Sequence, residues 1–548
     1  MRKIGAVVKN MELQRRNYKE HNQLTSINYT QTNSDADYQL TDEQKLCVEA
    51  SCRGANLKIK AFAGSGKTST LVEIAKKLSG RGLYLAYNKV IQLDAVKKFP
   101  KHIDCKTAHS IAYGANAYRI KGRVRNLNVF DIIEYIEIER IYNYEENDLA
   151  FLTLKLLRVF ANSDKQKIDK YFSTSSVFET VEGNDSKETK AIVNYVINRA
   201  AEYWKQCIEE ASMLPIEHDF YLKMYQLSQP NLSNAYDFIL FDECQDANPV
   251  LLDILSKQIC QKIYVGDEHQ QIYSWRGSIN AFEKLTGEDY YLSQSFRFGE
   301  ELSKLANIIT LAKGEKKLLR GSPAIETRIA EKSIEFPFTV LCRTNARIIE
   351  VILKFQSKRL HVVGGVVEVL NLAKSGYALF TGDISNVKHL KLKQFKSWNA
   401  MLHFNHKYQD PDITFLAKLI KEHEHGFKKV IFQIENANYV AEDIADITLS
   451  TIHKSKGREW NNVVVEDDFM IFGAGGTIEE ILINDTEELN LIYVAVTRAK
   501  RSLLLAKGVN VLIERLRSHN KKQRQGTEYG ILPPRNIDVI TYEQCARA

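Results

Sequence analysis

The chain has 548 residues, of which 44% are hydrophobic and 26% charged, with a formal net charge of +7. This length exceeds one ordinary domain, so we expect two to four, and we expect neither a membrane-spanning nor a secreted chain because a long apolar run and a signal sequence are both missing. The modest positive charge is compatible with a polyanionic partner. Eight scattered cysteines without a CxxC pair favour reduced thiols in a cytoplasmic protein over disulfides or a zinc or iron–sulfur site.

Residues 1–38 are polar and mixed, and we expect a lightly packed lead-in there. From about residue 57 onward, short apolar strands alternate with helical patterns. This alternation is typical of parallel sheets covered on both faces, so the predicted fold class is α/β. The expected strands are LKIKAF, GLYLAY and the segments 237–243, 262–267, 338–344, 462–467 and 502–507.

Two stretches interrupt this alternation. Residues 113–235 have largely helical patterns, and residues 367–445 are mixed and contain lysine-rich pieces such as KHLKLKQFKSW. Each stretch is predicted to be an accessory insertion into one α/β unit. The predicted division is a lead-in at 1–38, a first unit at 39–112 and 236–298, its insertion at 113–235, a second unit at 299–366 and 446–515, its insertion at 367–445, and a C-terminal tail at 516–548 with a solvated basic run, KKQRQ.

The segment AFAGSGKTST resembles a phosphate-binding loop between a strand and a helix. Gly64 and Gly66 let backbone amides turn toward phosphate oxygens, Lys67 adds a cation, and the Thr68 hydroxyl can ligate Mg²⁺. The positive end of the helix that follows adds to the same site. The generic pattern has glycine where this chain has Ala61. The segment therefore predicts a triphosphate site despite one departure.

Complementary acids follow the apolar strand in FILFDECQD. Asp242 can hold Mg²⁺, while Glu243 can polarise the attacking water. Adjacent acids at a strand end are also common on surfaces, but an upstream phosphate loop favours the catalytic interpretation. Gln245 and Asp246 are expected to bridge toward Gln270.

The segment VGDEHQQIYSWRGS combines a phosphate-sensing amide with aromatic side chains. Gln270 can detect the terminal phosphoryl group, whereas Tyr273, Trp275 and Arg276 can hold the stacked bases of a single strand. The alternative is a buried strand end followed by a turn with core aromatics. The first interpretation predicts coupling between nucleotide state and the hold on nucleic acid.

Two arginines are candidates to stabilise the charge of phosphoryl transfer. They are Arg297 in LSQSFRF and Arg498 in LIYVAVTRAK. Spacing alone does not separate either from an ordinary surface arginine.

Taken in order from about 40 to 507, the motifs resemble those of the UvrD/Rep-type superfamily 1 DNA helicases. HDFYLK and SQSFRF are similar to the branch of the F-box DNA helicases, although too little precedes Gln44 to expect an F-box domain. The resemblance implies two RecA-like P-loop NTPase domains. The motifs are LTDEQ (40–44), AFAGSGKT, YNK (87–89), TAHS (107–110), FDECQD, GDEHQQIYSWRG, SQSFRF (293–298), LCRTNA (341–346), VVGG (362–365), TIHKSKGREW (451–460) and YVAVTRAK (493–500).

The same resemblance implies residue roles. Gln44 would read the adenine edge and Phe296 would stack on its face, while Glu459 would contact the ribose. Gln270, Arg297 and Arg498 would contact the γ-phosphate. For the two histidines of the strand-binding set, a hydrogen-bonded structural role is the alternative. The implied nucleotide-binding set is Gln44, Ala63, Gly64, Ser65, Gly66, Lys67, Thr68, Ser69, Phe296, Arg297, Glu459 and Arg498; the strand-binding set is Asn88, His109, Tyr273, Trp275, Arg276 and His453; the metal ligands are Thr68 and Asp242.

Three features depart from the family pattern. Ser69 stands where many relatives have an arginine that stacks on adenine, which predicts looser base selectivity. Arg458 replaces a usual leucine and could contact phosphate or face solvent. The second insertion is short, which argues against regulation by a large swinging domain.

The resulting hypothesis is a cytoplasmic, ATP- and Mg²⁺-dependent translocase on single-stranded DNA that unwinds tailed or forked duplexes, with 3′→5′ polarity implied by the resemblance alone. DNA repair, recombination and mobile-element or defence processing are the expected settings. A nuclease or repair partner would be a separate chain, and no membrane partner is expected. The alternatives are a nucleotide-gated DNA-clamping ATPase or partner-binding module without unwinding activity, and an RNA-directed enzyme.

Overall fold

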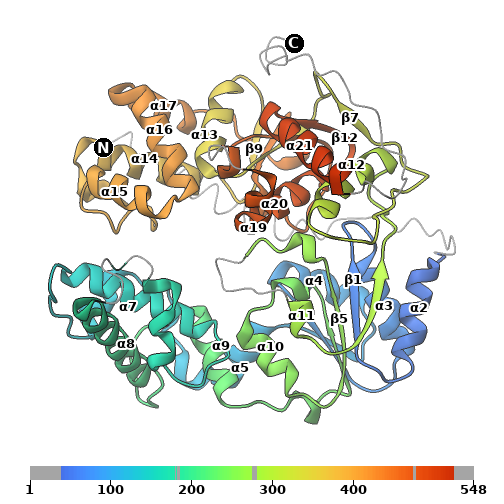
Figure 1. Ribbon diagram of the computed structural model, residues 1–548, viewed down its shortest axis with the longest axis horizontal. Coiled ribbons are helices and arrows are strands. Elements are labelled where there is room, and N and C mark those ends of the chain that lie inside the picture. Colours follow the sequence, from blue (N-terminus) through green and yellow to red (C-terminus); the bar gives the residue numbers. More distant parts are fainter. Residues whose placement is uncertain (1–38, 179–180, 182–185, 274–280, 473–476, 524–548) are drawn as a thin grey trace, which may run out of the picture. The chain divides into compact units, whose positions relative to one another are not determined.

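The computed structural model describes residues 39–178, 181, 186–273, 281–472 and 477–523. Two six-stranded sheets, in which all strand pairs are parallel, organise these residues (Figure 1). This arrangement confirms the predicted α/β class with two parallel sheets. We call the part built on the first sheet lobe 1 and the part built on the second sheet lobe 2. The predicted lead-in and the chain after residue 523 lie outside the described residues.

The first sheet has the strand order β3-β2-β4-β5-β1-β6. Because β4, β5 and β1 are neighbours and run parallel, the turns that follow their carboxyl ends lie side by side. These turns hold the phosphate loop, the paired acids and the Gln270 segment, so the topology gathers three distant motifs at one edge. The strands are β1 (Leu57–Ala61), β2 (Gly82–Ala86), β3 (Ile103–Thr107), β4 (Phe238–Phe241), β5 (Gln261–Gly266) and β6 (Glu288–Leu292).

Apolar sequence explains the inner strands of this sheet. Every residue of β2 and β4 is buried, as expected for strands with helices on both faces. By contrast, β6 at the sheet edge is exposed at its first two residues. The two edge strands, β3 and β6, are the ones that the sequence did not predict. The helices of lobe 1 are α2 (Asp42–Ser51), α3 (Lys67–Lys77), α4 (Lys89–Lys98), α10 (Pro249–Ser256) and α11 (Ala281–Lys284).

The first insertion leaves the sheet after β3 and returns before β4. Thr107 begins it with a capping box, accepting a hydrogen bond from Ser110 N while the Ser110 hydroxyl accepts one from Thr107 N. Its apolar side chains, including Phe160 and Tyr203, belong to a buried cluster that continues into lobe 1 through Ile239. The insertion therefore shares a core with lobe 1. Its helices are α5 (Ala108–Ile120), α6 (Val129–Tyr135), α7 (Glu146–Ala161), α8 (Lys187–Cys207) and α9 (His218–Leu227).

The second sheet has the strand order β7-β12-β11-β8-β10-β9. Its central strand β8 is buried throughout. Three of these strands, β7, β9 and β10, were absent from the sequence prediction. The strands are β7 (Arg328–Ala330), β8 (Phe338–Cys342), β9 (Leu360–Val362), β10 (Ile447–Thr451), β11 (Trp460–Val465) and β12 (Ala499–Leu505).

The second insertion follows β9 and consists, where the structure describes it, mainly of helices, with an isolated β-bridge between Tyr439 and Leu360. Apolar residues at helical spacing explain this, because Leu416, Leu419 and Ile420 are buried on one face. Its helices are α14 (Val367–Thr381), α15 (Trp398–Tyr408), α16 (Pro411–His423) and α17 (Phe427–Glu435); those of lobe 2 are α12 (Glu300–Ala312), α13 (Asn345–Lys354), α18 (Ile452–Ser455), α19 (Ile478–Asn484), α20 (Thr486–Val496) and α21 (Lys507–Gln523).

One buried apolar cluster contains residues of both lobes. Phe62, Ala63 and Ile272 come from lobe 1, whereas Ile492 and Tyr493 come from α20 of lobe 2. The start of the phosphate loop is thus in the same core as α20. Each helix among the described residues is too short or too polar to span a bilayer.

Candidate nucleotide site and strand-binding surface

The predicted phosphate loop links β1 to α3. Gly64 and Gly66 have φ angles of 73° and 77°, in the left-handed region that favours glycine. A Cβ added at Gly64 would lie 2.6 Å from Ser295 Oγ, so the loop has no room for a larger residue there. Because α3 begins at Lys67, its positive end lies directly at the loop. Sequence and local geometry both fit a phosphate-binding turn.

The remaining loop residues also fit a phosphate ligand. Ser65 Oγ is buried and has no hydrogen-bond partner among the described residues, which is unusual for a buried polar atom. Ala63 N donates to the hydroxyl of Tyr493 at 3.2 Å. Ser69, in the first turn of α3, is exposed. An unpaired hydroxyl at the centre of a glycine loop is suited to an oxygen-rich ligand.

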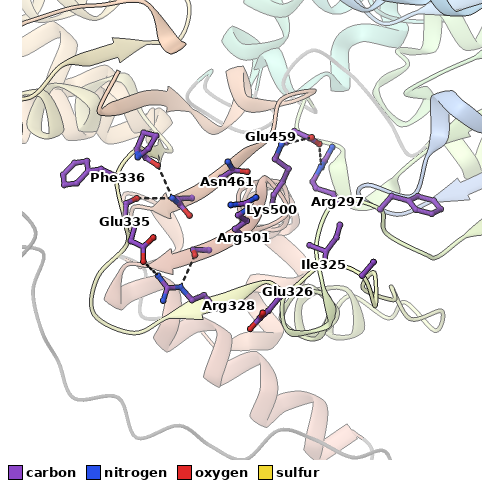
Figure 2. A pocket seen from close by; sticks show the side chains of 15 residues that line it. Arg297, Ile325, Glu326, Arg328, Glu335, Phe336, Glu459, Asn461, Lys500 and Arg501 are labelled. Carbon is purple, nitrogen blue, oxygen red and sulfur yellow. Dashed lines mark hydrogen bonds and ion pairs between the residues drawn. The ribbon is translucent and has the colours of Figure 1, made fainter. Parts of the chain in front are cut away.

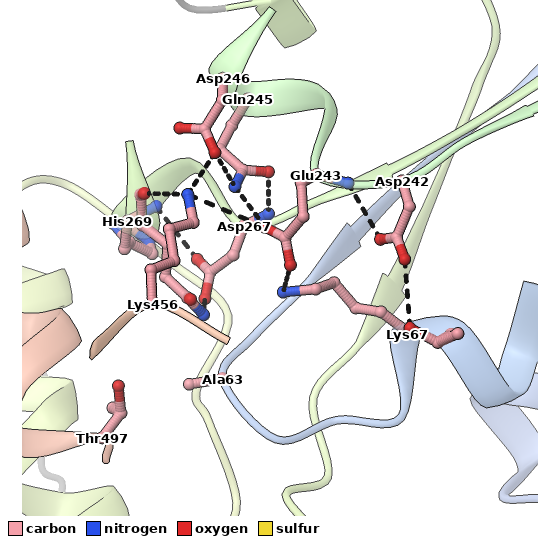
Figure 3. A network of polar contacts seen from close by, with 12 residues as sticks. Ala63, Lys67, Asp242, Glu243, Gln245, Asp246, Asp267, His269, Lys456 and Thr497 are labelled. Atoms are coloured by element: carbon pink, nitrogen blue, oxygen red, sulfur yellow. Dashed lines mark hydrogen bonds and ion pairs between the residues drawn. The ribbon is translucent and has the colours of Figure 1, made fainter. Parts of the chain in front are cut away.

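The paired acids after β4 face the start of α3 (Figure 3). Thr68 Oγ1 donates to Asp242 Oδ2 at 3.1 Å, and the Tyr84 hydroxyl donates to the same oxygen at 2.8 Å. Lys67 Nζ lies 3.3 Å from Glu243 Oε1. A hydroxyl and a carboxylate so close together form the donor set that Mg²⁺ prefers, so these residues fit the predicted metal.

Burial and charge give these groups distinct protonation behaviour. Burial raises the pKa of Asp242, and the neighbouring Glu243 carboxylate raises it further. Burial also acts to raise the pKa of Glu243, but Lys67 and Lys456 outweigh it and hold that pKa well below the ordinary value. Burial by itself would lower the pKa of Lys67, yet the surrounding carboxylates raise it. Glu243 is therefore ionised at neutral pH, as a general base must be.

Glu243 has a constrained backbone. Its φ of 54° lies in the left-handed region, which is uncommon for a residue other than glycine and often marks functional sites. Gln245 Nε2 donates to Glu243 Oε2 at 2.6 Å, and Gln245 Oε1 accepts from Asp267 N at 2.9 Å. Asp267 Oδ2 accepts in turn from Gln270 Nε2 at 2.7 Å. A continuous polar chain thus runs from the acids to Gln270.

Arg498 of lobe 2 lies at the end of this series of hydrogen bonds. Its Nη2 donates to Gln270 Oε1 at 3.1 Å, and its Nε donates to Val494 O at 2.9 Å. Burial, together with the charge of Arg297, lowers the pKa of Arg498 to about 9. Two of the predicted γ-phosphate contacts, Gln270 and Arg498, therefore meet although they come from different lobes.

The other predicted arginine, Arg297, also contacts lobe 2. Its Nε donates to Glu459 Oε2 at 2.8 Å, and its Nη1 donates to Thr497 O at 3.0 Å. Burial acts to raise the pKa of Glu459, but the charges of Arg297 and Lys500 outweigh it and lower that pKa. The structure thus pairs Arg297 with Glu459, the residue expected to contact the ribose.

The base end of the site lies beside the same loop. Gln44 is fully buried, and its Nε2 donates to Thr70 Oγ1 at 3.0 Å. A Cβ added at Gly66 would lie 3.0 Å from Gln44 Nε2 and 3.4 Å from the Phe296 ring, which shows that both side chains face the loop. Phe296 is 40% exposed, so part of its ring is accessible to a base.

A cavity of about 860 Å³ opens next to Phe296 and Arg297 (Figure 2). Glu459 and Lys500 line it from lobe 2, and Lys500 Nζ lies 3.5 Å from Glu459 Oε1. This volume is within the usual range for small-molecule sites. The cavity thus reaches three of the predicted nucleotide-binding residues, Phe296, Arg297 and Glu459.

Aromatic side chains form a second surface near Gln270, which we call the aromatic platform. The rings of Tyr273 and Tyr87 stack with centroids 5.5 Å apart, and the ring of His453 in α18 lies 6.0 Å from that of Tyr273. Lys456 Nζ lies 5.8 Å from the centroid of the Tyr87 ring and 5.4 Å from that of Tyr273. A cation above stacked rings is a suitable platform for bases of a single strand.

Two other predicted strand contacts have structural partners. His109 Nε2 lies 3.1 Å from Asp219 Oδ1, and both line a small cavity with Tyr273. Asn88 caps α4 by accepting from Ile91 N at 2.9 Å. Trp275 and Arg276 lie outside the described residues.

Arg458, one of the departures from the family pattern, has a protein partner. Its Nη1 donates to Glu442 Oε2 at 3.0 Å, and both side chains are partly exposed. The structure thus places this cation in a surface ion pair.

Sequence reasoning missed several residues at the centre of the site. Lys456 contacts Asp246 and donates to Gln270 O at 2.8 Å, so it joins the acidic chain to the aromatic platform. The hydroxyls of Tyr84 and Tyr493 donate to Asp242 and Asp267 respectively. Lys456 and Tyr493 both lie inside recognised motifs, TIHKSKGREW and YVAVTRAK, which was the available signal.

Two parallel sheets, a phosphate loop on one of them and an arginine from the other define a two-lobed P-loop NTPase. Residues 93–289 match the UvrD/REP helicase N-terminal domain. In this match and in its motifs the chain is similar to the UvrD-type superfamily 1 helicases, and it resembles the F-box DNA helicases.

Three relatives illustrate this likeness. F-box DNA helicase 1 of Gallus gallus is 30% identical over 516 residues, covering 87% of this chain and 50% of that protein. F-box DNA helicase protein 1 of Schizosaccharomyces pombe is 30% identical over 521 residues, covering 85% and 57%. A probable DNA helicase of Mycoplasma pneumoniae is 23% identical over 524 residues, covering 88% and 86%. The chain spans about half the length of the two F-box DNA helicases.

Proposed function

We propose that this protein is an ATP-driven motor that moves along single-stranded DNA and unwinds duplex DNA. The position of Lys456 is the observation that most directly supports this proposal. Its ammonium contacts Asp246 and Gln270 O on the nucleotide side and lies over Tyr87 and Tyr273 on the other. One side chain thus touches both the phosphate-sensing segment and the aromatic platform. A conformational change in either of them would therefore alter the contacts of Lys456 with the other.

The nucleotide end supports ATP hydrolysis. The loop amides and Lys67 would bind the phosphates, and Thr68 and Asp242 would hold Mg²⁺, which neutralises charge that develops on the phosphates. Lys67 lies 3.3 Å from Glu243 in this structure. Phosphates that attract Lys67 would release Glu243 to accept a proton from the attacking water.

Movement would come from the arginines of the interface. Arg498 belongs to lobe 2, so it can contact phosphates held by the loop of lobe 1 only when the two lobes approach each other, whereas Arg297 already lies beside that loop. ATP therefore favours the closed arrangement by contacts that are absent without it, and hydrolysis removes that preference. Each cycle would change which base lies against Tyr273.

The proposed substrate is inferred from the aromatic platform and from the names of the related proteins. Stacking is tolerant of base sequence, and the relatives described above are named DNA helicases. We infer single-stranded DNA and tailed or forked duplexes as substrates, with 3′→5′ polarity. Repair, recombination or mobile-element processing in the cytoplasm, with a separate nuclease or repair protein, would suit such a motor. A reducing compartment fits the seven described cysteines, which are free thiols.

Strand displacement tests the proposal. Duplexes with a 3′ tail, a 5′ tail or no tail would be incubated with the protein, ATP and Mg²⁺. We expect displacement from the 3′-tailed duplex. ATPase activity stimulated by DNA without displacement from any duplex would favour a nucleotide-gated clamp instead, and stimulation by RNA alone would favour an RNA-directed enzyme.

A further inference from the structure

Tyr493 is a fully buried tyrosine of α20 whose role the motor mechanism above does not use. Its hydroxyl accepts a hydrogen bond from Ala63 N at 3.2 Å and donates one to Asp267 Oδ2 at 3.2 Å. A hydroxyl can do both at once. One atom of lobe 2 thus binds the phosphate loop and the segment after β5 in lobe 1.

Asp267 passes this contact on to Gln270. Its Oδ2 accepts from both Tyr493 and the Gln270 side-chain amide, and its Oδ1 accepts from His269 N at 3.0 Å. With Nε2 held by Asp267, Gln270 presents Oε1 to Arg498. The orientation of the Gln270 amide therefore depends on how Asp267 is held.

His269 fixes the ring of Tyr493. Its imidazole stacks on Phe62 at 5.9 Å and meets the Tyr493 ring edge-on at 5.6 Å. Lys313 Nζ donates to His269 Nδ1 at 3.1 Å, and Glu315 Oε2 lies 3.3 Å from Nε2. Both ring nitrogens are thus engaged by residues that follow α12. The Tyr493 ring cannot shift without disturbing this buried packing.

We propose that Tyr493 is a positioning residue that makes the orientation of Gln270, and of the start of the phosphate loop, depend on α20 of lobe 2. This role rests on the proposed ATP hydrolysis. It acts through Asp267 and Ala63 rather than by contact with the nucleotide. Burial raises the pKa of Tyr493 well above its ordinary value, so the hydroxyl keeps the proton that it donates.

Tyr493→Phe keeps the ring and removes both hydrogen bonds. The matched control is Tyr203→Phe, because Tyr203 is also fully buried and donates to Pro215 O at 2.8 Å, but in the first insertion. Steady-state ATPase with saturating single-stranded DNA gives kcat and KM. We expect Tyr493→Phe to lower kcat at least about fivefold, because one lost hydrogen bond is equivalent to about that factor in rate and two are removed, with KM for ATP within about twofold. Tyr203→Phe should match wild type.

A double-mutant cycle separates positioning from a general structural effect. Against Gln270→Ala, the further change Tyr493→Phe should lower kcat by less than it does in wild type, because Gln270 is absent and only the contact with Ala63 remains to be lost. The inference would be overturned if the effects of the two substitutions on kcat were fully additive, or if Tyr493→Phe had the same kcat as wild type. In either case the proposed function would stand as long as the wild-type protein hydrolyses ATP. An inactive wild type would overturn both. If Tyr493→Phe does not fold, His269→Leu should show the same fall in kcat, and an unchanged kcat there would also overturn it.

Discussion

The guanidinium of Arg498 in lobe 2 donates a hydrogen bond to the side-chain oxygen of Gln270 in lobe 1 at 3.1 Å. The family resemblance predicts both residues as γ-phosphate contacts. A neutral amide holds this buried arginine, and its other described partners are backbone or hydroxyl oxygens. An anionic phosphate would be a stronger partner than any of these.

Arg498→Ala should therefore remove most hydrolysis. Arginines in this role contribute about 10³-fold or more to kcat, so we expect a loss of that order at saturating ATP. Arg359→Ala is the control, because Arg359 is an exposed arginine of lobe 2 that pairs with Asp446 at 2.6 Å. A steady-state ATPase assay measures kcat for both variants. Equal effects of the two substitutions would contradict the assignment of Arg498.

Glu243→Gln should bind ATP and DNA yet turn over slowly. The amide keeps the size of the side chain but cannot accept the proton of the attacking water, and a general base contributes roughly 10²–10⁴-fold. Single-turnover hydrolysis and nucleotide binding measured together check this. Rapid hydrolysis by the variant would place the base elsewhere.

Tyr273→Ala should weaken the response to DNA more than the binding of ATP. Base–aromatic stacking contributes about 1–3 kcal/mol per base, so the DNA concentration for half-maximal stimulation should rise roughly tenfold or more. Tyr171→Ala, at a 60% exposed tyrosine of the first insertion, is the control.

The same experiment on Trp275→Ala tests the aromatic residue two positions further along the sequence. This variant should keep nucleotide binding but lose stimulation by DNA. Unchanged stimulation in both variants would exclude these rings from the strand path.

The partly buried Lys313 predicts a pH effect on stability. Burial, the largest cause, lowers the pKa of Lys313 from 10.5 to about 8, although Asp267, Glu268 and Glu315 oppose it. The folded protein therefore releases this proton at lower pH than the unfolded chain does. Relative to Lys313→Met, wild type should gain stability as pH rises above about 8, by at most about 1.4 kcal/mol per pH unit. Urea unfolding across this range measures the difference, and a constant difference would contradict the shift.

Uninterrupted apolar runs made the inner strands predictable. Phe238–Phe241 is wholly buried and was expected as a strand. The edge strand Glu288–Leu292 was missed because its first residues are acidic and exposed, and Leu360–Val362 is too short to show a pattern. Tertiary pairing, rather than local sequence, makes these segments strands.

The motifs also predicted which segments meet, but not every contact between them. The bond between Ala63 and Tyr493 joins residues 430 positions apart, and nothing in the local pattern of either indicates it. Lys456 likewise gains its position only when α18 meets the Gln270 segment. The contacts of such residues can be identified only from the three-dimensional arrangement of both lobes.

The most direct test compares the ATPase rate of wild type and Lys67→Ala with and without single-stranded DNA. Lys77→Ala, at an exposed lysine at the end of the same helix, is the control. We predict that DNA stimulates wild type and Lys77→Ala, and that Lys67→Ala shows almost no hydrolysis in either condition. A near-wild-type rate in Lys67→Ala, or a wild-type rate indifferent to DNA, would contradict a motor in which one triphosphate site drives a strand.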